Sequence, residues 1–110
     1  MINECQTVQD FEQILQHSQS HPVFLFKYST ACLTSTRAWN RFKNFAETEK
    51  GAEFWRVLVI QQRPLSRQIA QHTGIAHESP QVLLFQGGQV TWHAAHGHIR
   101  EEVMRARLQP

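Results

Sequence analysis

The fold is decided by one stretch of sequence, which reads VFLFKYSTAC from Val23 to Cys32. Its first part, residues 23–28, is a nearly continuous run of β-branched and aromatic side chains, which is typical of a strand buried on both faces. A short polar loop at 29–31 leads to Cys32, and apolar residues then recur at helical spacing to about Gly51. The stretch therefore predicts a central strand, a loop and a cysteine at the start of a helix.

The remaining N-terminal half predicts further alternation of helix and strand. Residues 7–10 have the pattern of a capping box and open an amphipathic helix that ends near Ser18. A second apolar run at 54–60 predicts another strand. Between Arg63 and Gly74 the pattern is that of a short helix with glycine as its C-terminal stop.

The C-terminal half predicts a β-hairpin and a last helix. Apolar runs at 81–85 and 90–94 flank two glycines, which are typical of a tight turn. A closing amphipathic helix is indicated by three apolar residues at helical spacing, Ile99, Val103 and Ala106. These elements together predict an α/β fold with a mixed central sheet flanked by helices, in one domain that spans 1–110.

Composition excludes several classes of function. The chain has 110 residues, 41% of them hydrophobic and 18% charged, as expected of one globular core. The net charge is +2 and no basic run exceeds two residues, so we expect no nucleic-acid partner. No apolar stretch approaches the roughly 18 residues of a membrane span, and the N-terminus lacks the pattern of a secretory signal. We therefore expect a cytoplasmic protein with no membrane partner.

Cysteines and histidines narrow the chemistry further. Cys5 and Cys32 are too few for a disulfide framework, which agrees with a reducing compartment. Cys5 precedes the first helix, without a helix terminus to activate it. His93, His96 and His98 lie close together in the sequence, but no cysteine or carboxylate stands beside them at zinc-finger spacing. We therefore expect no metal site.

Cys32 is the candidate nucleophile. Unpaired backbone N–H groups and the helix dipole at a helix N-terminus favour a thiolate, which is the reactive form of cysteine. The segment 32–35 has the spacing of a Cys-x-x-Cys redox motif with Ser35 in the second position, so the resolving thiol is absent. Ser35 could donate a hydrogen bond to the sulfur or serve the helix backbone. The pattern indicates a mechanism that uses one thiol.

A second candidate element precedes the hairpin at Glu78-Ser79-Pro80. Thioredoxin folds place a proline here, usually cis, in the groove beside the active cysteine. We expect Ser79–Pro80 to be cis and close to Cys32, the alternative being an ordinary proline that starts a strand. His77 could contact the substrate or bond the backbone of its own loop.

These residues resemble the monothiol bacilliredoxins of the bacillithiol system, also known as YtxJ-like proteins. The resemblance covers most of the chain, and its most specific part is the His-Glu-Ser-Pro-Gln stretch at 77–81. The other matching segments are Tyr28 to Cys32 with Ser35, Arg63 to Ser66, and Trp92-His93 with His96. The chain departs from the family at Leu33, where the family usually has proline.

The resemblance implies a thioredoxin-like fold and a thiol–disulfide oxidoreductase. Such a protein removes bacillithiol from mixed disulfides on protein cysteines and takes it onto its own cysteine, here Cys32. S-bacillithiolated proteins and a low-molecular-weight thiol are then its partners, with bacillithiol as co-substrate and no bound cofactor. The residues expected to bind substrate around the catalytic Cys32 are Thr30, Ala31, Leu33, Ser35, His77, Ser79 and Pro80.

Two other functions stay open on the sequence. One is a redox-inactive interaction module that binds a partner through the groove at Pro80. The other is a glutathione-linked monothiol glutaredoxin-like protein, although the usual Cys-Gly-Phe-Ser signature is absent. A reactive Cys32 would distinguish an enzyme from the interaction module. The small thiol that the protein uses would distinguish a bacilliredoxin from a glutaredoxin-like protein.

Overall fold

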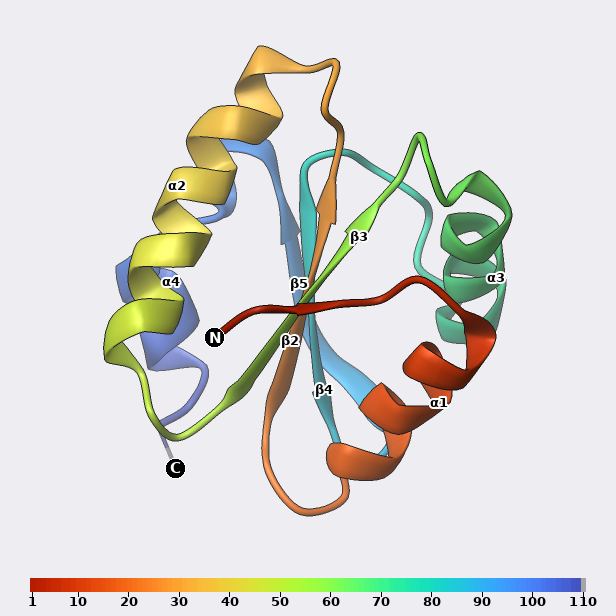
Figure 1. The fold of residues 1–110 in the computed structure, drawn as a ribbon. Coiled ribbons are helices and arrows are strands. Elements are labelled where there is room, and N and C mark those ends of the chain that lie inside the picture. Colours follow the sequence, from red (N-terminus) through yellow and green to blue (C-terminus); the bar gives the residue numbers. More distant parts are fainter. Residues whose placement is uncertain (110) are drawn as a thin grey trace.

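A five-stranded mixed sheet forms the centre of the computed structural model, which describes residues 1–109 (Figure 1). The strand order is β1-β3-β2-β4-β5. The strands are β1 (Asn3–Glu4), β2 (Val23–Tyr28), β3 (Glu53–Leu58), β4 (Gln81–Gln86) and β5 (Gln89–Ala95). Strand β2 runs parallel to β3 and antiparallel to β4, so the prediction of a central strand at 23–28 is confirmed.

Helices cover both faces of this sheet (Figure 1). They are α1 (Val8–His17), α2 (Leu33–Thr48), α3 (Arg63–Thr73) and α4 (Glu101–Ala106), with a 3₁₀ turn, η1 (His96–His98), before the last. Helices α1 and α3 pack on one face, and α2 and α4 on the other. None of the helices within residues 1–109 is long and apolar enough to cross a membrane.

Local sequence signals explain where several elements begin and end. The Thr7 hydroxyl accepts a hydrogen bond from the Asp10 N–H at 3.0 Å, and the Asp10 carboxylate accepts one from the Thr7 N–H, so the capping box is confirmed. Gly74 ends α3 in the left-handed conformation. Gly87 and Gly88 both have positive φ, 63° and 80°, as a two-residue hairpin turn requires.

Two features differ from the prediction. Strand β1 was not expected, because two residues carry no readable periodicity, and it pairs with β3 at the sheet edge. The last helix begins at Glu101, since η1 forms a separate turn in which the Ile99 N–H bonds the His96 carbonyl. The apolar face predicted for this helix, Ile99, Val103 and Ala106, is therefore wrong. Ile99 is buried but precedes the helix, Met104 is the buried residue within it, and Ala106 is exposed.

The core consists of two apolar clusters, one on each face of the sheet. Alternate residues of β2 point to opposite faces, with Leu25 toward α1 and α3 and Phe26 toward α2 and α4. The α2 face is largely aromatic, and its buried rings are Phe24, Phe26, Phe42, Phe45 and Phe54. Aromatic packing therefore holds α2 against the central strand.

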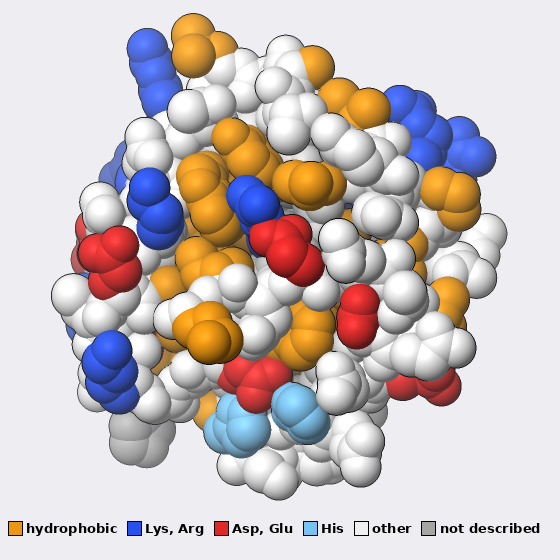
Figure 2. Space-filling view, viewed as in Figure 1, with side chains coloured by type: hydrophobic (Ala, Val, Ile, Leu, Met, Phe, Trp, Pro, Cys, Tyr) orange, Lys and Arg blue, Asp and Glu red, His pale blue; other side chains and the backbone are white. Residues whose placement is uncertain are grey.

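Partly exposed aromatic groups continue this cluster to the surface. Figure 2 shows apolar side chains gathered in the middle of one face around a basic and an acidic side chain. The guanidinium of Arg56 lies over the Trp39 ring, 4.9 Å from its centroid, and pairs with Glu4 at 2.7 Å. The aromatic rings at this surface therefore pack against the cluster, and the Arg56–Glu4 ion pair partly covers Trp39.

Replacing Phe42 with alanine should destabilise the protein by about 3–5 kcal/mol, because it leaves a cavity in the aromatic cluster. The Phe42 ring centroid lies 5.1 Å from that of Phe26 and 5.6 Å from that of Phe54. Urea unfolding followed by fluorescence measures the change. Val8→Ala, at a half-exposed position of α1, is the control and should change stability by less than about 0.5 kcal/mol. A loss below about 1 kcal/mol for Phe42→Ala would contradict the cavity argument.

Candidate active site

Cys32 lies at the N-cap of α2, just beyond the carboxyl end of β2. Its backbone is extended, with φ −121° and ψ 121°, and its carbonyl accepts the Thr36 N–H at 3.3 Å. The side chain makes no capping hydrogen bond and is partly exposed. The sulfur is thus free to react at the positive end of a 16-residue helix, as the sequence predicts.

Hydrogen bonds around the sulfur favour its thiolate form. The Thr34 hydroxyl lies 3.4 Å from the sulfur and gives the largest contribution, and the N–H groups of Ser35 and Thr34 add to it. Together these groups lower the pKa of Cys32 below its ordinary value, against a smaller desolvation effect that raises it. Sequence reasoning missed Thr34, although a hydroxyl two residues after a helix N-cap is a readable signal.

Ser35 is fully buried where a resolving cysteine would stand. Its hydroxyl accepts the Ser29 N–H at 3.3 Å and lies 3.4 Å from the Ser79 hydroxyl. It also gives a small hydrogen-bond contribution that lowers the pKa of Cys32. Ser35 therefore serves both the sulfur and the backbone, and it links the loop after β2 to the loop before β4.

The Ser79–Pro80 bond is cis, as predicted. Pro80 is buried, and its carbonyl accepts the His96 N–H at 3.1 Å, which joins this loop to η1. The contact between Ser79 and Ser35 brings the loop to the first turn of α2. The two predicted elements of the site thus meet, although they are 44 residues apart in the chain.

Cys5 is a core residue on the other face of the sheet. It is 1% exposed and belongs to the cluster under α1 and α3. Burial first, and then the charge of Asp10, raise the pKa of Cys5 to about 12. Cys5 therefore remains a thiol at neutral pH, and of the two cysteines only Cys32 is partly exposed and has a lowered pKa.

A protein-family model, the monothiol bacilliredoxin BrxC, matches residues 3–104. The chain belongs to this family. A solved structure described as a candidate oxidoreductase with a thioredoxin fold is 30% identical to the chain, with a TM-score of 0.89. The match covers 98% of this chain and 94% of the solved one.

Thioredoxins share the fold at lower identity. The thioredoxin of Malassezia sympodialis is 20% identical, with a TM-score of 0.77 and coverage of 98% of this chain and 88% of its own. The thioredoxin of Fasciola hepatica is 14% identical, with a TM-score of 0.76. The match covers 96% of this chain and 95% of the thioredoxin. This bacilliredoxin family member is therefore a thiol oxidoreductase with a thioredoxin-like fold.

Three of the other expected site residues flank Cys32 in the chain and are here called the rim: Thr30, Ala31 and Leu33. Thr30 and Ala31 are exposed in the loop before Cys32, and the Thr30 hydroxyl accepts a hydrogen bond from the Gln61 amide at 3.4 Å. Leu33 follows Cys32 and is 73% exposed, an unusual position for a large apolar side chain. The rim therefore offers both polar groups and an apolar contact to a substrate.

Among residues 1–109, the His77 ring bonds side chains of other elements rather than the backbone of its own loop, and its contact with a substrate stays a prediction. Its Nδ1 lies 3.5 Å from the Lys27 Nζ and 3.3 Å from the Ser66 hydroxyl. Burial first, and then the nearby charges of Lys27 and Arg63, lower the pKa of His77. His77 thus connects its loop, which also carries Pro80, to the central strand and to α3.

Lys27 is a fully buried lysine that sequence reasoning missed as a functional candidate. Burial lowers its pKa from 10.5 to about 8. Its cross-strand neighbour Gln81 has a side-chain oxygen that lacks a hydrogen-bond partner in the described residues 1–109. The signal was present in the sequence, because Lys27 is the one charged residue in an otherwise apolar strand.

Replacing Thr34 with valine should raise the pKa of Cys32, because the mutation removes the strongest hydrogen bond to the sulfur. The rate of alkylation by iodoacetamide, measured against pH, reports this pKa. Thr36→Val is the matched control, an exposed threonine on the same helix whose removal should leave the profile unchanged. A wild-type midpoint at or above about 8.5, or identical profiles for wild type and Thr34→Val, would contradict the assignment.

Replacing Lys27 with methionine should change how stability depends on pH. Between pH 8 and 10.5 the unfolded chain holds a proton on Lys27 that the folded protein has lost, so folding stability rises with pH through this window. The stability of Lys27→Met relative to wild type should therefore fall by about 3 kcal/mol from pH 7 to pH 10.5, as measured by urea unfolding. Lys43→Met, at an exposed site, should show no such trend. A constant difference across the window would show that Lys27 titrates normally.

Proposed function

We propose that this protein removes bacillithiol from mixed disulfides on protein cysteines, with Cys32 as the nucleophile. The observation that carries the proposal is that one exposed, acidified thiol stands at a helix N-terminus with Ser35 in the resolving position. Family membership supports the choice of bacillithiol among small thiols. The proposed partners are therefore S-bacillithiolated proteins and a low-molecular-weight thiol.

The proposed first step is a thiol–disulfide exchange. The Cys32 thiolate attacks the bacillithiol sulfur of the mixed disulfide, and a new disulfide forms between Cys32 and bacillithiol. The old disulfide bond breaks, and the substrate's cysteine leaves as a thiolate. The number of disulfides is unchanged, so this step needs no bound cofactor and no external electrons.

The adduct on Cys32 must then be cleared from outside. Ser35 cannot form a disulfide, and Cys5 is buried on the opposite face of the sheet with its thiol protonated. A second small thiol, as its thiolate, attacks the adduct, frees Cys32 and leaves as a disulfide with bacillithiol. Until that thiol arrives the adduct persists.

The loop at Ser79 is the proposed docking point for the substrate protein. Within residues 1–109, neither the N–H nor the carbonyl of Ser79 has a hydrogen-bond partner. An extended substrate segment can pair with such free backbone groups as an added strand does. The exposed residues Thr30, Ala31 and Leu33 flank Cys32 in the chain and complete the proposed contact surface.

Cys32→Ser should abolish transfer, whereas Cys5→Ala should leave it within about twofold of wild type, because exchange requires a thiolate at the site. The test uses a protein bacillithiolated at a single cysteine and follows both proteins by intact mass spectrometry. With no small thiol added, wild type should accumulate the bacillithiol adduct on Cys32.

The same protein carrying glutathione distinguishes the competing functions. Faster transfer of glutathione than of bacillithiol would assign the chain to glutathione chemistry, and absence of any transfer would favour an interaction module. A Cys5–Cys32 disulfide in wild type, together with an adduct trapped only in Cys5→Ala, would show a mechanism with two thiols.

A further inference from the structure

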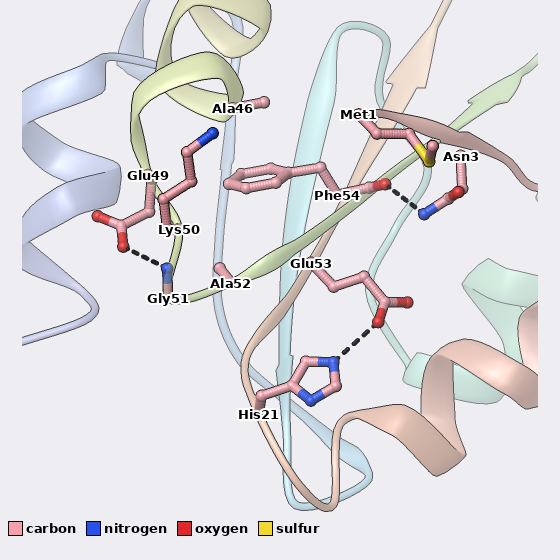
Figure 3. A pocket seen from close by; sticks show the side chains of 10 residues that line it. All are labelled: Met1, Asn3, His21, Ala46, Glu49, Lys50, Gly51, Ala52, Glu53 and Phe54. Atoms are coloured by element: carbon pink, nitrogen blue, oxygen red, sulfur yellow. Dashed lines mark hydrogen bonds and ion pairs between the residues drawn. The ribbon is translucent and has the colours of Figure 1, made fainter.

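A groove lies at the amino ends of β2 and β3, the opposite end of these parallel strands from Cys32 (Figure 3). Its volume is about 610 Å³. His21 and Glu53 line it together with residues from the N-terminus and the turn before β3. The groove is open to solvent, so ions and water can reach both side chains.

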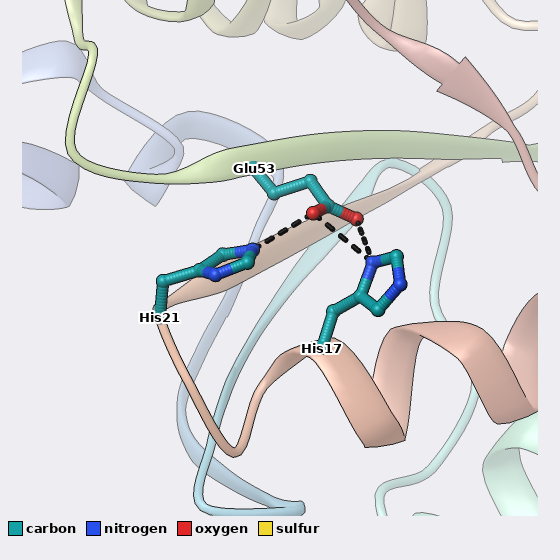
Figure 4. Close-up of side chains that lie close together, drawn as sticks. All are labelled: His17, His21 and Glu53. Atoms are coloured by element: carbon teal, nitrogen blue, oxygen red, sulfur yellow. Dashed lines mark hydrogen bonds and ion pairs between the residues drawn. The ribbon is translucent and has the colours of Figure 1, made fainter.

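Three potential metal ligands converge beside this groove (Figure 4). The Nδ1 of His17 lies 2.9 Å and 3.1 Å from the two carboxylate oxygens of Glu53, and the Nε2 of His21 lies 2.8 Å from one of them. The ligand atoms all lie within 4.8 Å of one another. Two imidazole nitrogens and a carboxylate are ligands that zinc and related divalent metals prefer.

The backbone sets the positions of the two histidines. The His21 N–H donates to the His17 carbonyl at 3.2 Å, so the two residues keep the i to i+4 relation of a helix beyond the end of α1. Histidines four residues apart present their rings to the same side, as in helical zinc sites. The intervening Ser18 is fixed in turn, because its hydroxyl accepts the Gly88 N–H at 2.9 Å.

Glu53 is brought to the histidines by strand pairing and is held by a further partner. The Glu53 N–H donates to the Pro22 carbonyl at 2.9 Å. Pro22 precedes Val23, the β2 residue that pairs with Glu53 in the sheet. The Trp55 indole N–H donates to a Glu53 carboxylate oxygen. An outer hydrogen bond of this kind orients a ligating carboxylate.

We propose that His17, His21 and Glu53 bind a divalent transition metal ion, with zinc as the preferred occupant and water in the remaining position. Neighbouring ligand atoms around tetrahedral zinc are about 3.3 Å apart. Each imidazole nitrogen, now 2.8–3.1 Å from a Glu53 oxygen, would move outward from the carboxylate by up to about half an ångström, and the two nitrogens, which lie within 4.8 Å of each other, would settle at that spacing. The rings are free to do so, since the side chains of His17 and His21 are 39% and 43% exposed. The proton that each ring shares with Glu53 moves to its other nitrogen or to solvent.

A bound metal would fasten three separate segments together. His17 ends α1, His21 precedes β2 and Glu53 begins β3. The bond to each would add to the hydrogen bonds and ion pairs that these three side chains already make with one another. Binding to the folded state alone raises its stability, so zinc should raise the melting temperature.

The test is calorimetric titration of Zn²⁺ into the full chain carrying Cys32→Ser, which removes a competing thiolate and makes the result independent of thiol exchange. We expect one zinc per chain and a higher melting temperature on binding. Glu53→Gln and His21→Gln, each in that background, should weaken binding at least tenfold. His98→Gln, which removes an exposed histidine from the separate cluster at 96–98, is the matched control and should leave the affinity unchanged.

Ring-nitrogen NMR of the Cys32→Ser protein requires no substitution at the site. On addition of zinc, the signals of His17 Nδ1 and His21 Nε2 should shift together and saturate at one equivalent. The proposal is overturned by absence of binding, by unchanged affinity in Glu53→Gln and His21→Gln, or by shifts confined to His96 and His98.

Discussion

The packing of α2 against the central strand is the contact on which the site depends. The rings of Phe42 and Phe26 meet at 5.1 Å, and those of Phe45 and Phe24 at 5.5 Å. These contacts fix the helix along its length, so its first turn comes to lie beyond the end of β2. The lowered pKa of Cys32 follows from that position, since the first turn of α2 supplies the Thr34 hydroxyl and the N–H groups of Ser35 and Thr34, which favour a thiolate.

Much of this arrangement was predictable from local patterns, because strand, loop, cysteine and helix follow one another directly in the chain. The capping box was also predictable, since it depends on the adjacent residues 7–10, and the cis proline was predictable from the place of Ser79-Pro80 in a thioredoxin-like fold. The approach of the Ser79-Pro80 loop to the cysteine was expected from the same fold. The particular contacts of Ser35 with Ser79 and of Lys27 with His77 were not predictable, because they join residues 44 and 50 positions apart. The start of α4 was missed for a different reason. The apolar residues from Ile99 onward look like one helical pattern, but the turn at η1 places Ile99 outside the helix.

Ser35 shows how one substitution in a redox motif changes both chemistry and structure. A thiol at this position would compete for the disulfide on Cys32, whereas the hydroxyl instead accepts the Ser29 N–H and lies against Ser79. In the proposed mechanism the site therefore does not complete its own catalytic cycle, and the supply of small thiol sets its turnover.

Leu33 has a consequence for the charge that thiol exchange creates. The family usually has proline at this position, and proline carries no backbone N–H. Leu33 retains one, and no partner for it is found among residues 1–109. In the proposed exchange, negative charge in the transition state is spread over the attacking, central and leaving sulfurs rather than held by one atom. An unpaired N–H at the first turn of α2, besides those of Thr34 and Ser35 that favour the thiolate, adds to the positive potential at the helix end that this charge would meet.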